Sequence, residues 1–422
     1  MKPTDKKSYF FVLICVFLLS LTGPALSQQS APVQHEEKSR VQKWQEDIDE
    51  MASELPKRHK NLFFQLTKST FKQEIQNLKK DLPDLSDEEI IWRLSCIVAS
   101  AGDSHTSLRY QTKIAFPFTL YWFQKGIYAI NTVPEYKHIL NRRLVKINNK
   151  PIEKVVETLK KGISHENEAQ IKSSAPYFIA MAEYLYGAHV IEEKDKANFT
   201  FEMEKGKPFD VHMEAISLKT KPEWIVSNEN EENLPLYRQN RDKPYSFTYL
   251  KNEKTIYVLY NSCRMMKGKL FKDFVMEVFE QVDNNPVEQF VVDLRNNGGG
   301  NSMIFYPMLK ELKEREKLNQ KDNLFVIVGR RTFSSAILNA LQMKNQTNAT
   351  LIGEPTGGKP NHFGEIKYFQ LSNSRLHISY STKYFSFSQQ DTDSIYPDIT
   401  VEISIEDYLS KKDPVLEKIL KR

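Results

Sequence analysis

The sequence predicts an α/β fold built around a parallel sheet in the C-terminal half of the chain. Three short segments each contain an unbroken apolar run: "QFVVDLR" at 289–295, "LFVIVG" at 324–329 and "ATLIGE" at 349–354. Between them lie two segments with the apolar spacing of amphipathic helices, 303–314 and 334–344. Buried strands that alternate with such helices are typical of parallel strands joined by crossover connections.

The alternation of strands and helices begins further upstream, and near the C-terminus it gives way to strands alone. "TIYVLYNSC" at 255–263 predicts another strand, and "LFKDFVMEVFEQV" at 270–282 predicts the helix after it. Residues 366–387 are rich in aromatic, Ser and Thr residues and predict added antiparallel strands. We therefore expect one α/β domain over residues 244–422.

The region before this domain divides into a helical part and a strand-rich part. Residues 28–113 contain helical periodicity in "VQKWQEDIDEMASELPKRH" and a helix capped by Ser86, followed by "DSHTSL" in a loop. Residues 114–220 begin with two strands around Lys125-Gly126, and strands are again expected at 197–203 and 209–217. Polar residues 221–243 predict a linker.

Within the strand-rich part, one segment resembles a known module. "RRLVKINNKPIEKVVETLKKG" predicts a strand, an Asn-Asn turn and a helix, which is similar to the second half of a PDZ-like module. The carboxylate-binding loop of the Gly-Leu-Gly-Phe type is absent upstream of it. Capture of a peptide terminus is therefore not predicted for this region.

The first 27 residues predict a secretory signal peptide cleaved near Ser27. Lysines precede an apolar run from Tyr9 to Leu21 that is short for a bilayer span, and small residues follow it. An uncleaved membrane anchor is the alternative. Either reading predicts an extracytoplasmic protein.

Composition excludes several classes of function. Removal of the signal takes away three lysines and Asp5, which lowers the formal net charge from +5 to +3, and the remaining charges are interspersed. No nucleic-acid patch and no Cys/His metal spacing are present, and we expect no cofactor. Cys96 and Cys263 remain as either one disulfide or two free thiols.

Three loops carry the candidate chemistry, because parallel sheets place their sites at the carboxyl ends of the strands. "RNNGGGN" suits either a tight turn or a set of backbone N–H donors for an oxyanion. Ser334 and Ser335 stand where a helix begins, as a cap or as a nucleophile with a neighbouring N–H. Lys359 is either a solvated loop residue or a desolvated general base.

The third loop also contains a partial phosphate-binding motif. "GEPTGGK" matches G-x-x-x-x-G-K, but Pro360 stands where a nucleotide-binding loop needs Ser or Thr for Mg²⁺. The Walker-B-like "FVVDL" precedes the loop instead of following it. The sequence therefore argues against an ATPase and against nucleotide binding.

Taken in order, "DLRNNGGGNS", "GRRTFSSAIL", "LIGEPTGGKP" and "SIYPDI" closely resemble the C-terminal processing (tail-specific) serine proteases. Tricorn core proteases and the interphotoreceptor retinoid-binding protein repeats are relatives in this resemblance, which is dense over residues 250–410. It implies a ClpP/crotonase-like catalytic domain. It also implies that Ser334 is the nucleophile, and that Ser335 and Gly299 supply the oxyanion donors, with Gly298 as a close second to Gly299.

The resemblance leaves the general base open between two branches of the family. The bacterial processing enzymes imply Lys359, but Phe363 stands where they have an assisting glutamine. The tricorn-like branch implies His105, preceded by Ser104. Because histidine titrates near neutrality without help, we favour His105 as base and Lys359 as an electrostatic or structural helper.

Two further positions complete the expected site. Asp391 stands near the position where the tricorn-like branch has a glutamate, with Asp393 as a substitute, and His362 is a third candidate base. The expected function is an extracytoplasmic serine endopeptidase that acts on a protein or peptide through an acyl-enzyme. A catalytically inactive ligand- or peptide-binding protein on the same scaffold is the alternative.

Overall fold

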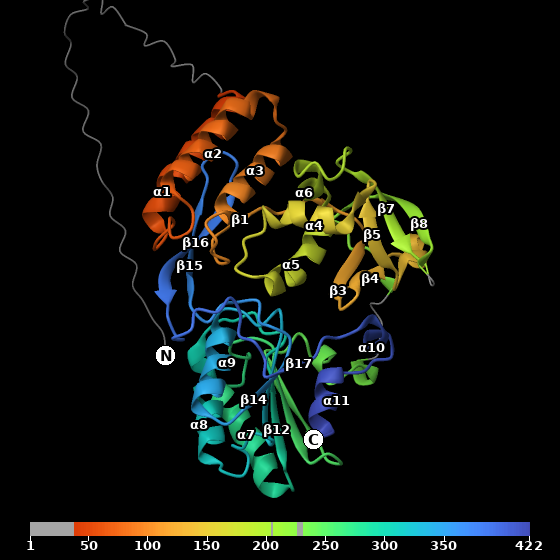
Figure 1. Cartoon of the computed structure of the whole chain (residues 1–422), viewed down its shortest axis with the longest axis vertical. Coiled ribbons are helices and arrows are strands. Elements are labelled where there is room, and N and C mark those ends of the chain that lie inside the picture. The colour runs from red at the N-terminus through yellow and green to blue at the C-terminus, as the bar shows by residue number, and fades with distance from the viewer. Residues whose placement is uncertain (1–37, 204–205, 226–230) are drawn as a thin grey trace, which may run out of the picture. The chain divides into compact units, whose positions relative to one another are not determined.

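The computed structural model describes residues 38–203, 206–225 and 231–422 (Figure 1). The chain divides into the units Met1–Ser39 and Arg40–Arg422, and everything below concerns the second. The predicted signal peptide lies outside the described residues. Among the residues described, no helix has the length and apolar character needed to cross a membrane.

A six-stranded sheet with the order β10-β11-β12-β13-β14-β17 forms the centre of the C-terminal region. All neighbouring strands are parallel except β10, which runs antiparallel to β11. The predicted parallel strands are confirmed. The strands are β10 (Tyr245–Leu250), β11 (Thr255–Tyr260), β12 (Gln289–Asp293), β13 (Leu324–Val328), β14 (Thr350–Gly353) and β17 (Ile399–Thr400).

Both faces of this sheet are buried. On one face, Phe290 and Val292 join a core that includes α7 (Phe271–Asn284), α8 (Tyr306–Glu314) and α9 (Ser335–Gln346). On the other face, Val291 joins a core with α11 (Pro414–Leu420). This two-sided burial explains why the strands are continuously apolar rather than alternating.

A second, antiparallel sheet has the order β3-β4-β5-β7-β8 and shares its core with the helices that lie between β6 and β7. The predicted strand, turn and helix at 142–162 are confirmed, and the turn residues Asn148 and Asn149 both have positive φ, as a tight hairpin turn requires. The PDZ-like assignment stays a prediction. The elements are β3 (Phe118–Phe123), β4 (Gly126–Thr132), β5 (Arg143–Ile147), β6 (Lys150–Pro151), α4 (Ile152–Lys160), α5 (Glu168–Ala180), α6 (Ala182–Gly187), β7 (Lys196–Glu202) and β8 (Pro208–Glu214), with β2 (Ile114–Ala115) pairing β9 (Ile216–Ser217).

The N-terminal helices share their core with strands from the far end of the chain. The helices are α1 (Arg40–Arg58), α2 (Lys68–Asp81) and α3 (Asp87–Ala99), and the strands are β15 (His362–Gln370) and β16 (His377–Phe385). Leu371 and Ile378 of this predicted antiparallel hairpin are buried among the helices. The short helix α10 (Ile405–Leu409) precedes α11.

The segment expected to be a loop at 103–108 contains a strand. β1 (Ser107–Arg109) pairs antiparallel with β16, so that Ser107 lies opposite Ser379. A three-residue strand has too short a pattern to be seen in the sequence, because its partner lies more than 250 positions away. This pairing fixes the segment that carries His105 beside the C-terminal hairpin.

Both cysteines of the described residues are free thiols. Burial raises the pKa of Cys96 to about 12 and that of Cys263 to about 11. Both are therefore protonated and unreactive at neutral pH.

Candidate active site

Ser334 occupies a strained turn between β13 and α9. Its φ of 53° and ψ of −126° lie outside the regions that L residues commonly adopt. It stands at the N-cap of α9 but its hydroxyl makes no capping hydrogen bond. The side chain is therefore not used as a helix cap, and backbone strain of this kind is concentrated at functional sites.

The turn before Ser334 is fixed by buried polar groups. Thr332 Oγ1 donates to Leu294 O at 2.8 Å and accepts from Gly329 N at 3.0 Å. Phe333 N donates to Asn297 O at 3.0 Å, which joins this turn to the glycine-rich loop after β12. The two loops therefore form one rigid unit.

The glycine-rich loop approaches Ser334 at Gly299. A Cβ placed on Gly299 would lie 2.8 Å from Ser334 Cβ and 3.0 Å from Ser335 N, and its φ is +102°. Only glycine allows both this close approach and this positive φ. The Gly299 N–H donates to Asn297 Oδ1 at 2.9 Å, so this N–H is directed into the loop.

His105 reaches the same place from the N-terminal region. Its backbone N–H donates to Asp103 Oδ1 at 2.9 Å, and its carbonyl accepts from Ser379 Oγ at 3.0 Å. Its ring stacks on Phe333, with 4.5 Å between the centroids, and faces His362 at 5.6 Å. Within the described residues, neither ring nitrogen of His105 has a hydrogen-bond partner of normal geometry.

These residues line one cavity of about 610 Å³. His105, Ser334, Ser335, Gly299 and Gly298 all contribute to its wall, as does the third candidate base His362. The tertiary structure thus brings together residues from both ends of the chain that the motifs single out.

Lys359 and Asp391 are placed elsewhere, since neither lines this cavity. Lys359 Nζ lies 3.5 Å from Asp391 Oδ1, and the Asp391 side chain is 60% exposed. The backbone carbonyl of Lys359 accepts from His362 Nδ1 at 2.8 Å, because a carbonyl only accepts. Lys359 thus orients His362 through its backbone.

Burial decides the protonation state of His105. Loss of solvation lowers its pKa, and the charge of Asp103 only partly opposes this, so that the pKa is about 4. His105 is therefore neutral at pH 7 and able to accept a proton. Asp103 Oδ1 lies 3.8 Å from His105 Nδ1, beyond a hydrogen bond but close enough to favour a positive ring electrostatically.

Asp103 is held ionised by its neighbours. Burial raises its pKa, but the hydrogen bond from His59 and the nearby His105 outweigh this and lower the pKa to about 2. His59 Nε2 lies 3.0 Å from Asp103 Oδ2, and His59 Nδ1 accepts from Asn61 N, which leaves the proton on Nε2. Thr106 Oγ1 also donates to Asp103. Sequence reasoning missed Asp103, although it stands two positions before His105.

Glu166 is a second carboxyl that sequence reasoning missed. Burial and the charge of Asp103 raise its pKa to about 8, although Ser104 and Lys359 act in the opposite direction. Among the described residues, Glu166 Oε2 and Ser104 Oγ are both buried without a hydrogen-bond partner of normal geometry. Glu166 lies in the polar loop before α5, where no motif marks it. In the described part of the chain, no cluster of three His, Cys, Asp or Glu residues is arranged to hold a metal ion.

A family model matches the segment of the chain that carries Ser334. Residues 305–401, which include Ser334, match the model of peptidase family S41. No curated protein matches the sequence. The structure of mature CPAF complexed with lactacystin is similar, with a TM-score of 0.63, 12% identity, and coverage of 90% of this chain and 97% of that chain.

Two other solved structures extend the comparison. Mature CPAF has a TM-score of 0.62 at 12% identity and covers 90% of this chain and 96% of that one. The photosystem II D1 C-terminal processing protease has a TM-score of 0.41 at 12% identity, with the same coverage of 90% and 96%. At these identities the two CPAF structures show a shared fold.

The match of residues 305–401 to peptidase family S41 supports a serine-type peptidase as the class of the protein. The resemblance to C-terminal processing and tricorn-like proteases is confirmed: the S41 match covers the segment from α8 to β17.

Proposed function

We propose that the protein is an extracytoplasmic endopeptidase that cleaves peptide bonds through an acyl-enzyme on Ser334. One observation carries this proposal. A strained serine whose hydroxyl makes no capping bond shares a cavity with a buried, neutral histidine whose ring nitrogens are both without partners in the described structure. The extracytoplasmic location rests on residues 1–27 alone.

The proposed reaction uses His105 as the general base. Its neutral ring takes the proton of Ser334 Oγ as the oxygen attacks the peptide carbonyl, and the resulting imidazolium gives that proton to the departing amine. Water then attacks the acyl-enzyme with the same assistance and releases the acid and Ser334. Asp103, 3.8 Å from the ring, stabilises the imidazolium, in place of the exposed Asp391.

The oxyanion of the tetrahedral intermediate needs two N–H donors. Ser335 N stands in the first turn of α9, where backbone N–H groups have no partner within the helix. Because the Gly299 N–H is bonded to Asn297, we propose the N–H of Gly298, which also lines the cavity, as the second donor. The role of Gly299 would then be steric, since its missing side chain lets the glycine-rich loop lie against Ser334.

The substrate would bind as an extended strand. β15 is an edge strand of the sheet β1-β16-β15, and its residues Glu365 and Ile366 line the catalytic cavity. An unpaired edge offers backbone donors and acceptors to a peptide. A protein or peptide added along β15 would lead its backbone toward Ser334.

A ligand-binding protein without catalytic activity is the second candidate. It is favoured by one observation, namely that Ser334 makes no hydrogen bond to His105 in the described structure. Catalytic hydrogen bonds are often long in unliganded enzymes and shorten when substrate binds. The experiment below separates the two candidates.

The test is labelling with a fluorophosphonate, followed by peptide mapping. We expect the label on Ser334, loss of labelling in His105→Ala, and retention of labelling in Lys359→Ala. Ser302→Ala serves as a matched control, because Ser302 also lines the cavity but has no role in the proposed reaction. The opposite dependence on His105 and Lys359 would establish a Ser–Lys dyad, and absence of label between pH 6 and 10 would favour the binding protein.

A further inference from the structure

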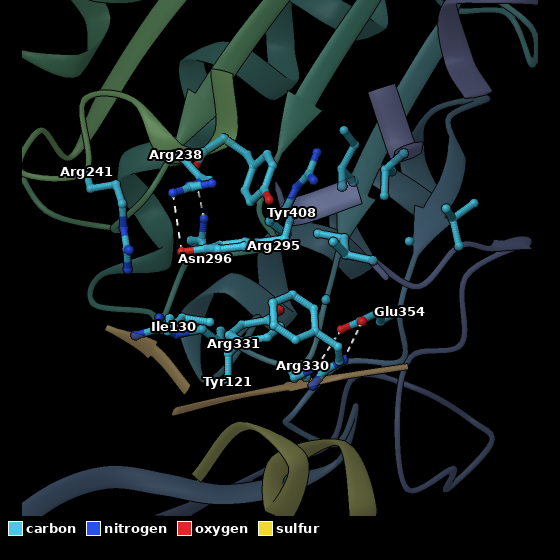
Figure 2. Close-up of a pocket in the computed structure, with 18 of the residues that line it drawn as sticks. Tyr121, Ile130, Arg238, Arg241, Arg295, Asn296, Arg330, Arg331, Glu354 and Tyr408 are labelled. Atoms are coloured by element: carbon cyan, nitrogen blue, oxygen red, sulfur yellow. Dashed lines mark hydrogen bonds and ion pairs between the residues drawn. The ribbon is translucent and has the colours of Figure 1, made fainter. Parts of the chain in front are cut away.

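A second cavity, of about 530 Å³, lies beside the catalytic loops but has a different lining. Its wall comes from β3 and β4 and from residues that follow β12, β13 and β14. It contains an unusual number of guanidinium groups and several tyrosines (Figure 2). The arginines are Arg238, Arg241, Arg295, Arg330 and Arg331.

Two of these arginines are neutralised within the protein. Arg295 forms a bidentate pair with Asp413, with N–O distances of 2.9 and 2.8 Å. Arg330 forms a bidentate pair with Glu354, which is drawn in Figure 2. Their charges support the fold and do not require a ligand.

Arg241 and Arg331 differ from Arg295 and Arg330, since neither has an acidic partner among the described residues. The two side chains come from different segments, Arg241 from the stretch before β10 and Arg331 from the turn after β13 (Figure 2). Crowding by protein atoms and the nearby charge of Arg241 lower the pKa of Arg331. Both residues keep exposed surface, so solutes can reach them.

The remaining arginine and the tyrosines shape the cavity. The Arg238 guanidinium lies over the Tyr408 ring, 4.2 Å from its centroid, which leaves an aromatic wall next to the charged groups. A volume of this size is in the usual range of about 300–1,000 Å³ for small-molecule sites. Guanidinium forks bind carboxylate and phosphate oxygens in a bidentate manner.

We propose that this cavity binds a small organic dianion, either a phosphate monoester or a dicarboxylate, between Arg241 and Arg331. Two guanidinium groups that have no acidic partner in the described structure match two negative charges, and the tyrosines contact the organic body of the ligand. A monoanion would leave one of the two repelling charges unbalanced. The proposal does not depend on peptidase activity.

A ligand in this second cavity would contact loops that also form the catalytic cavity. Arg331 stands three positions before Ser334 in a turn that Thr332 fixes to Leu294 O. Asn296, also in the wall of the second cavity, precedes the glycine run. A ligand that joins Arg331 to Arg241 therefore stabilises the turn that presents Ser334, and we expect it to raise the rate of fluorophosphonate labelling.

The test measures thermal stability and binding heat in phosphate-free buffer of low ionic strength. Phenyl phosphate and isophthalate are the dianionic probes, and benzoate is the monoanionic control. We expect a dianion to raise the melting temperature, because a ligand that binds only the folded state stabilises it. The probe with the greater affinity identifies the source as a phosphate ester or a dicarboxylate.

Variants assign the effect to the cavity. Arg241→Gln and Arg331→Gln should each weaken binding about tenfold or more, since each removes one charge-assisted pair. Lys251→Gln removes the same charge from an exposed turn outside the cavity and should leave binding unchanged. Circular dichroism of each variant checks that it is folded.

Three results would overturn the proposal. They are the absence of binding by both dianions, equal binding of benzoate, and full retention of binding in the folded Arg241→Gln and Arg331→Gln variants. Because these measurements need no hydrolysis, they fail or succeed independently of the peptidase mechanism.

Discussion

The ring of His105 stacks on the ring of Phe333, the residue immediately before Ser334, with 4.5 Å between their centroids and 22° between their planes. The proposed base is therefore held against the turn that carries the proposed nucleophile. Phe333 is in turn fixed by its backbone bond to Asn297. This stacking replaces a hydrogen bond as the means by which His105 is oriented.

Phe333→Leu tests this role as a positioning residue. The shorter, non-planar side chain keeps most of the apolar volume but loses the flat surface under His105, so we expect kcat to fall about 10- to 100-fold. KM should change little, because the backbone of the turn remains. Leu338→Ile, another apolar side chain in the wall of the cavity, is the control. Equal losses of kcat in both variants would contradict a specific role for the stacking.

Gly299→Ala should lower activity strongly by steric means. The new Cβ would lie 2.8 Å from Ser334 Cβ at a φ of +102°, so the glycine loop must move away from Ser334. We expect kcat to fall by about 10²–10³, because movement of the loop displaces the proposed donor Gly298 and a lost oxyanion donor has an effect of this size. The measurement is single-turnover acylation by an ester substrate.

Gly268→Ala is the matched control for Gly299→Ala. Its φ is +78°, but a Cβ there has no neighbour within 4 Å. It therefore carries backbone strain without the clash, and it should lose stability of about 1 kcal/mol with its kcat unchanged. A similar loss of kcat in Gly268→Ala would point to a global effect instead.

The pH dependence of acylation should reflect the low pKa of His105. Because burial lowers this pKa to about 4, the ring stays neutral and able to accept a proton well below its ordinary value of 6.5. We expect the rate of fluorophosphonate labelling to decline only as the pH approaches about 4. An acid limb centred near 6.5 would show that His105 is solvated in the working enzyme.

The lowered pKa of His105 also makes the free energy of unfolding depend on pH. The unfolded state binds a proton at His105 below pH 6.5, whereas the folded state does so only below about pH 4. Folding therefore loses stability as the pH falls through this window, by at most about 1.4 kcal/mol per pH unit. His105→Phe removes this contribution, and urea unfolding at pH 4.5, 5.5 and 6.5 measures it.

Glu166 gives a pH dependence of the opposite sign. Its folded pKa of about 8 lies above the ordinary value of 4.5, so its contribution to stability is complete below pH 4.5 and is lost as the pH rises toward 8. Glu166→Gln keeps the shape without the titration and should flatten the stability profile between pH 5 and 8, by at most about 1.4 kcal/mol per pH unit. Glu168→Gln, exposed on α5, is the control. A profile unchanged by Glu166→Gln would show that Glu166 is ionised in the folded state.

Much of the C-terminal region could be predicted because its signals are local. Continuous apolar strands of about five residues, helices with a single apolar face, and glycine runs after strands each fit within a short window of sequence. The cavity position of Ser334 follows from the same logic, since serine after a buried parallel strand must lie at the carboxyl edge of the sheet. The signal peptide and its location stay predictions.

The choice among candidate bases and acids was decided only by long-range packing. Lys359 and Asp391 fit the motif spacing, yet they pair with each other outside the catalytic cavity. Asp103 and Glu166 have no motif, and their pKa values depend on burial by segments distant in the chain. Burial is a property of the assembled fold, so spacing along the chain does not reveal it.

By itself, then, the sequence determined the parallel sheet, the turn that presents Ser334, and the glycine loop beside it, because each depends on neighbouring residues. The tertiary structure alone decided that β1 pairs with β16 and thereby sets His105 against Phe333. It also decided which arginines of the second cavity have acidic partners. These contacts join segments far apart in the chain, and only the folded backbone determines the distances between them.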